Sequence, residues 1–223
     1  MDVPSTAATA AVDGGALLAF GPGVSAQHRT DASYALLLAQ LVANRKFNRF
    51  AATEHWYGVF GETLQSLGWI VKDHEGFVRH RPRAFPYRID SLVLAALRPP
   101  LVDDAGSNVL SDALKALAGL PDGERAVELF DEYGQFEESG NFQVALVEEA
   151  DALVAVRLGR FRFRVADEET ARGRLPRTDF HAGDVFHRGA QTLHLNEEVY
   201  GPLRDDIAAK LGDRVGVLIA PVT

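Results

Sequence analysis

Residues 35–50 (ALLLAQLVANRKFNRF), 55–60 (HWYGVF) and 67–69 (LGW) decide the fold of this 223-residue chain. The first range predicts a helix that begins after a cap at Thr30 or Asp31, runs to about Ala43 and has almost no polar face; a polar loop follows it. In the second range the apolar residues recur at spacings of three and four, which predicts an amphipathic helix. The third range leads into a short strand. Both helices must therefore be buried against other elements.

The pattern of the chain changes near residue 140. Before this point, residues 107–117 and 122–133 repeat the helical period, whereas residues 142–146 and 154–165 alternate as strands of a hairpin do. This order predicts an α+β fold. We expect a helix-rich N-terminal half to pack on a largely antiparallel sheet that is formed mainly by the C-terminal half.

Residues 1–25 are small and turn-forming, with Gly14-Gly15 and Gly21-Pro22-Gly23 among them. Such a composition is not expected to bury enough apolar surface to order itself. We interpret residues 1–25 as a flexible or partner-bound arm and residues 26–223 as a single α+β domain.

Composition limits the function classes. The 223 residues carry a formal net charge of −8, which argues against a nucleic-acid partner because such proteins usually have a basic footprint. The chain has no cysteine, so disulfides and thiolate sites are excluded. We find no Sec-type signal and no apolar window long enough to span a membrane. The expected location is the cytoplasm, or export without a Sec signal peptide.

A metal site is the sharpest catalytic hypothesis. His181, Asp184, His187 and His194 lie close together in sequence, and imidazole with carboxylate is typical of metal ligation. However, histidine spacings of six and seven match no helical or strand-borne metal motif. The alternative is that these are ordinary surface or hydrogen-bonded histidines.

An anion site is the second hypothesis. Arg160, Arg162 and Arg164 alternate with phenylalanines, so one strand face would be basic and able to hold an anionic partner or phospholipid headgroup. The apolar parity changes at Gly159, which predicts a β-bulge or a break in the strand there. The basic segment 79–88 is similar but proline-rich, which favours a surface loop. The alternative for both is a solvated surface.

The sequence contains no Gly-x-Ser-x-Gly elbow, phosphate loop or dinucleotide fingerprint, so neither an enzyme nor a cofactor is favoured. Five motifs resemble a dispersed family of uncharacterised microbial proteins of virulence or toxin-like character. These motifs are LLLAQLVANRKFNRF at 36–50, WYGVF at 56–60, LGW at 67–69, GNFQV at 140–144 and LNEEVYGPLRDDIAAKLG at 195–212. The resemblance implies a shared fold and indicates no site residue.

We therefore predict a non-catalytic binding, assembly or effector-type protein that acts through surface contacts, with a protein partner or self-association and with the arm as the contacting element. One alternative is a metal-assisted hydrolase centred on His181, His187 and His194. Another is a membrane-active, toxin-like protein that uses the helix at residues 34–43 and the basic strand face at a membrane surface.

Overall fold

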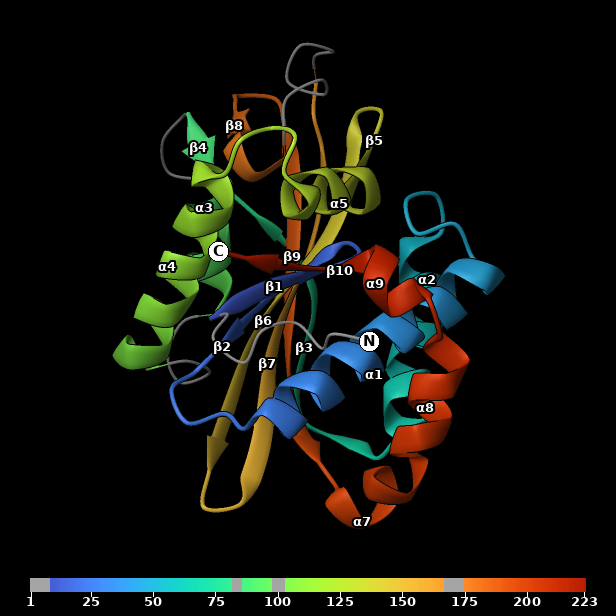
Figure 1. The fold of residues 1–223 in the computed structure, drawn as a ribbon. Helices are drawn as coiled ribbons and strands as arrows, with labels where there is room; N and C mark the ends of the chain where they lie inside the picture. The colour runs from blue at the N-terminus through green and yellow to red at the C-terminus, as the bar shows by residue number, and fades with distance from the viewer. Residues whose placement is uncertain (1–8, 82–85, 98–102, 167–174) are drawn as a thin grey trace.

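The computed structural model describes residues 9–81, 86–97, 103–166 and 175–223. The fold is α+β, as expected, and consists of a central sheet with helices on both faces (Figure 1). In the described residues the sheet has eight strands in the order β10-β1-β2-β6-β7-β9-β3, and β5 pairs with β6. The β2–β6 pair is parallel and the other described pairs are antiparallel.

The bounds of the sheet strands are β1 Ala10–Asp13, β2 Ala16–Phe20, β3 Trp69–His80, β5 Gln135–Phe136, β6 Ser139–Ala150, β7 Leu153–Arg164, β9 Val185–Leu195 and β10 Ile219–Val222. A separate two-stranded ladder joins β4 (Tyr87–Arg88) to β8 (Asp179–Phe180). The helices are α1 Ala26–Lys46, α2 Thr53–Ser66, α3 Ile89–Ala96, α4 Asp104–Gly119, α5 Arg125–Gly134, α7 Glu197–Tyr200, α8 Arg204–Leu211 and α9 Arg214–Leu218. Two short 3₁₀ turns, η1 (Leu175–Arg177) and η2 (Gly201–Leu203), complete the described elements.

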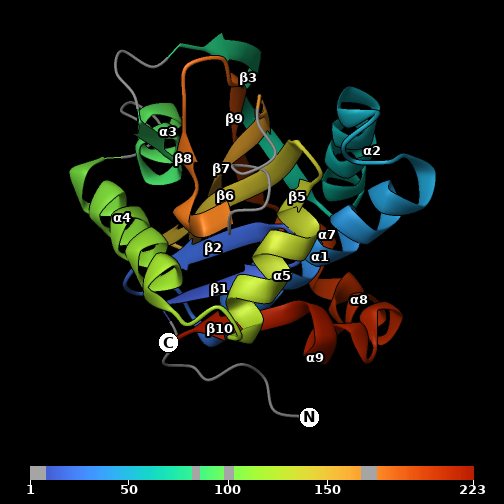
Figure 2. The ribbon, with the colours of Figure 1, turned by 90° about the horizontal axis from the view of Figure 1, so that it is seen from above.

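Two helical layers enclose the sheet, as the view from above shows (Figure 2). Helices α3, α4 and α5 cover one face, where the ring of Phe130 packs against Phe142. Helices α1 and α2 cover the other face, where the Tyr57 hydroxyl donates to Asn141 at 2.8 Å. No helix in the described part of the chain is both long enough and apolar enough to cross a bilayer.

The expectation of an N-terminal arm is wrong for residues 10–20. These residues form β1 and β2, which are interior strands of the sheet, and all of them are buried. Small apolar residues gain their burial from strands on either side and from the helices above and below, so tertiary context overrides their weak local signal. Residues 1–8 lie outside the described part of the chain.

Helix α1 begins earlier than the sequence indicated. Ser25 is its cap, and the Ser25 hydroxyl accepts from the backbone N–H of His28 at 3.2 Å. The predicted absence of a polar face is explained by packing, because α1 lies against α2, α8 and the sheet. In α2 the expected apolar stripe is buried, and Trp56 stacks on Phe60 with their ring centroids 5.2 Å apart.

The predicted hairpin is β6–β7, but the bulge expected at Gly159 is absent. The ladder continues through the Val144–Gly159 pair without a register shift. Because helices cover both faces of these central strands, apolar residues occur at either parity. Gly159 instead makes room for a ring, since a Cβ atom there would lie 2.7 Å from the Phe161 side chain.

Candidate functional site

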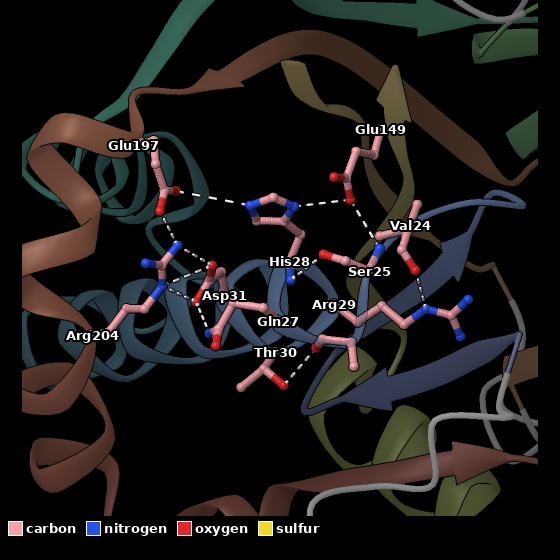
Figure 3. Close-up of polar contacts among 11 residues, drawn as sticks. Val24, Ser25, Gln27, His28, Arg29, Thr30, Asp31, Glu149, Glu197 and Arg204 are labelled. Carbon is pink, nitrogen blue, oxygen red and sulfur yellow. Dashed lines mark hydrogen bonds and ion pairs between the residues drawn. The ribbon is translucent and has the colours of Figure 1, made fainter. Parts of the chain in front are cut away.

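Five charged or titratable side chains meet where α1 begins, and we call them the clasp. His28 and Asp31 come from α1, Glu149 from the end of β6, Glu197 from α7 and Arg204 from the start of α8 (Figure 3). The sequence separates these groups by up to 176 positions, yet the fold places them side by side.

The Asp31–Arg204 pair is the inner half of the clasp. Arg204 Nη2 lies 2.8 Å from Asp31 Oδ2 and its Nε lies 3.0 Å from Oδ1, so the contact is bidentate. The Asp31 residue is only 2% exposed. Hydrogen bonding to Asp31 raises the pKa of Arg204, which keeps the guanidinium charged.

His28 forms the outer half of the clasp. Its Nδ1 lies 2.9 Å from Glu149 Oε2, and its Nε2 lies 3.9 Å from Glu197 Oε2 (Figure 3). Glu149 also accepts from the backbone N–H of Ser25 at 2.8 Å. The pKa of Glu149 is lowered, first by this backbone hydrogen bond and then by the contact with His28. The clasp thus ties α1 to the β6–β7 end and to α7.

The clasp has the residue types of a metal site. His28, Asp31 and Glu197 each offer one ligand atom, and these atoms lie within 4.8 Å of one another. However, Arg204 already donates to both Asp31 and Glu197 and therefore supplies the positive charge that a metal ion would bring. The chemistry of the donor set fits an internal ion-pair network better than a cation site.

Two of the histidines that the sequence suggested as metal ligands, His187 and His194, do not lie together in the structure. His187 and His194 lie on β9 seven residues apart, so they point to opposite faces of the sheet and are about 23 Å apart along the strand. His181 lies between β8 and β9, and it contacts Asp184 through its backbone N–H at 2.8 Å. Asp184 also accepts from Ala166 N at 2.9 Å, which makes it a brace for this loop.

The three arginines of β7 share one face, as predicted, but their surroundings differ. Arg160 is buried beneath the rings of Tyr57 and Phe77, and it donates to the backbone oxygen of Glu75 at 2.7 Å. Burial lowers its pKa. Arg162 and Arg164 lie nearer the surface. Arg160 is therefore part of the packing.

A basic row crosses three strands on this face, and it consists of Arg79, Arg162, Arg164 and His187. Arg162 of β7 and Arg79 of β3 are both register partners of His187 on β9, so the three side chains are neighbours on the same side of the sheet. Burial lowers the pKa of His187, and the positive charges of Arg162 and Arg79 lower it further. The sequence indicated Arg79 only as part of a basic segment, because strand register was unknown.

The chain matches no protein-family model, and a comparison with curated proteins gives no match either. Among solved structures, a delta-endotoxin superposes with a TM-score of 0.47 and 9% identity, over 87% of this chain and 86% of that chain. The Evf virulence factor superposes with a TM-score of 0.40 and 9% identity, over 86% and 76% of the two chains. Neither likeness assigns a family to this chain.

Proposed function

We propose that this chain is a non-catalytic, effector-type binding protein that engages an acidic protein partner through the basic row. The observation that carries the proposal is a contrast between two groups of charges. In the clasp, Arg204 pairs with both Asp31 and Glu197, and His28 lies beside Glu149. In the basic row, Arg162 and Arg79 flank His187 as its direct cross-strand neighbours.

The like charges of Arg162 and Arg79, on either side of His187, repel one another. One ion pair offsets part of this repulsion, with Arg162 Nη1 3.7 Å from Glu54 Oε1, but the Glu54 side chain is 75% exposed. Exposed pairs of this kind contribute little. A bound acidic partner would relieve the repulsion that remains.

The overall charge of −8 makes this local surface selective. An acidic partner is repelled by most of the molecule and attracted to the basic row, which orients the encounter. The separation of His187 and His194 on opposite faces of β9 supports a binding role over a hydrolytic one, because a metal-assisted reaction needs its ligands within one site.

Binding to fluorescent polyglutamate, measured by anisotropy at low salt, tests this proposal. The double variant Arg79→Gln and Arg162→Gln should bind about tenfold more weakly, equivalent to ~1.4 kcal/mol. Arg188→Gln is the matched control, since Arg188 follows His187 on β9 but points to the opposite face. Equal affinities of wild type and double variant, or an equal loss in the control, would refute the assignment of the surface.

A further inference from the structure

We infer that the basic row recognises a phosphate group, which binds between Arg162, His187 and Arg79 beside the first turn of α2. This inference rests on the proposed function in that it uses the same basic row, and it names a phosphate group as the anion that the row holds. Arg162 and Arg79 flank His187 on either side in the β7–β9–β3 ladder. Side chains at directly paired positions start about 5 Å apart, so three donors can reach the oxygens of one phosphate.

The α2 helix provides a second feature that suits an anion. It has 14 residues and begins at Thr53, and Ala52 at its cap position provides no side-chain hydrogen bond to the first turn. The N–H groups of a first helical turn and the helix dipole favour negative charge. Glu54 of this turn lies beside Arg162, which places the helix start next to the basic row.

Arg162 is held in position before any ligand arrives. Its guanidinium lies 5.3 Å from the ring centroid of Phe77, and that of buried Arg160 lies 5.2 Å from the same ring. Phe77 in turn packs on Tyr57 of α2 with ring centroids 5.2 Å apart. This contact restrains the Arg162 guanidinium and lowers the entropy lost on binding.

Glu54 is the competitor that a phosphate must displace. Its carboxylate is mostly exposed and 3.7 Å from Arg162, so it can turn into solvent at little cost. The charged groups that act on His187 are Arg162 from β7, Arg79 from β3 and Glu54 from α2. A phosphate in place of Glu54 adds negative charge beside the imidazole. It should therefore raise the pKa of His187.

An NMR titration of the histidine signals with inorganic phosphate tests the inference in the full chain at constant ionic strength, with sodium acetate as the comparison salt. Phosphate should shift His187 saturably and raise its pKa, whereas acetate should not. His194 is the internal control, because it lies at the other end of β9 on the opposite face. Arg162→Gln and Arg79→Gln should each weaken phosphate binding about tenfold. Arg188→Gln should leave it unchanged.

Vesicles identify the source of the phosphate group. If a lipid headgroup is the ligand, the chain should co-sediment with phosphatidic acid vesicles more than with phosphatidylcholine vesicles, and this binding should depend on Arg79 and Arg162. If free phosphate binds in a manner that depends on these two arginines but the vesicles do not, the ligand is soluble. Either result supports the inference. If neither free phosphate nor phosphatidic acid binds in a row-dependent manner, the inference is overturned. Row-dependent binding of polyglutamate would in that case still uphold the proposed function.

Discussion

Asp13 shows how one buried residue can oppose the stability of the fold. It is the last residue of β1 and its side chain is completely buried. Neither carboxylate oxygen has a hydrogen-bond partner among the described residues. Burial raises its pKa well above the ordinary value of 3.8. The folded chain therefore keeps a proton that the unfolded chain releases.

This proton fixes the sign of a pH dependence. Above pH 3.8 the unfolded carboxyl ionises while the folded one stays neutral, so the free energy of unfolding falls as pH rises until the raised pKa is passed. Asp13→Asn should abolish this slope but leave a polar group buried. Asp13→Val should also remove the unsatisfied group and stabilise the fold at pH 7 by about 1 to 3 kcal/mol. Urea unfolding from pH 4 to 7 checks both variants, and a wild-type slope in Asp13→Asn would contradict this account.

At the scale of elements, the clasp connects a helix and a strand that are far apart in sequence. Glu149 closes β6, while His28 and Ser25 belong to the start of α1. The lowered pKa of Glu149 means that its ionised form stabilises the fold above the ordinary value of 4.5. The contribution is lost as pH falls through the lower folded value.

Glu149→Gln should therefore destabilise the protein by about 1 kcal/mol at pH 7, and the difference from wild type should disappear in acid. Urea unfolding between pH 3 and pH 7 provides the comparison. Glu128→Gln is the control, because within the described part of the chain the Glu128 side chain forms only an exposed pair with Arg125, at 3.8 Å. The control should change stability by less than about 0.5 kcal/mol. A difference for Glu149→Gln that is independent of pH would show that charge is not the cause.

Hydrophobic periodicity correctly predicted the elements whose own residues show a clear helical or strand pattern. The α2 stripe of Trp56, Phe60 and Leu64 is buried as expected, and the hairpin at residues 139–164 is present. By contrast, β1 and β2 were missed because Ala10 and its neighbours have little intrinsic strand preference and depend for their burial on strands that are distant in sequence. Gly159 was misinterpreted because alternation fails as a guide where both faces of a strand are covered.

The candidate sites depended more strongly on information that the sequence lacks. Arg162 and Arg164 could be found from their alternation, and His187 from its residue type, although the sequence suggested metal chemistry for it. That these residues lie next to Arg79 depends on the register of β3 and β9, which no local sequence pattern specifies. The clasp was not foreseen, since His28 and Glu149 are 121 positions apart and follow no motif.

At the scale of the whole molecule, the central sheet combines strands from both ends of the chain. β10 from the C-terminus pairs with β1, and β1 pairs with β2, which joins the β6–β7 hairpin through the parallel β2–β6 ladder. The N-terminal strands thus connect the C-terminal strand to the rest of the sheet (Figure 2). This arrangement makes folding depend on contacts between residues that are far apart in sequence.

Two truncations test whether residues 10–20 act as strands of the sheet or as the arm that the sequence predicted. Deletion of residues 1–20 removes β1 and β2, so it should leave β10 without its partner and expose one edge of β6. An apolar edge of that length is a template for aggregation. We therefore expect loss of the cooperative urea transition and poor solubility. Deletion of residues 1–8 keeps every described strand and should retain a single cooperative transition by circular dichroism. If the longer truncation unfolds as cooperatively as the full chain, β1 and β2 do not hold the sheet together.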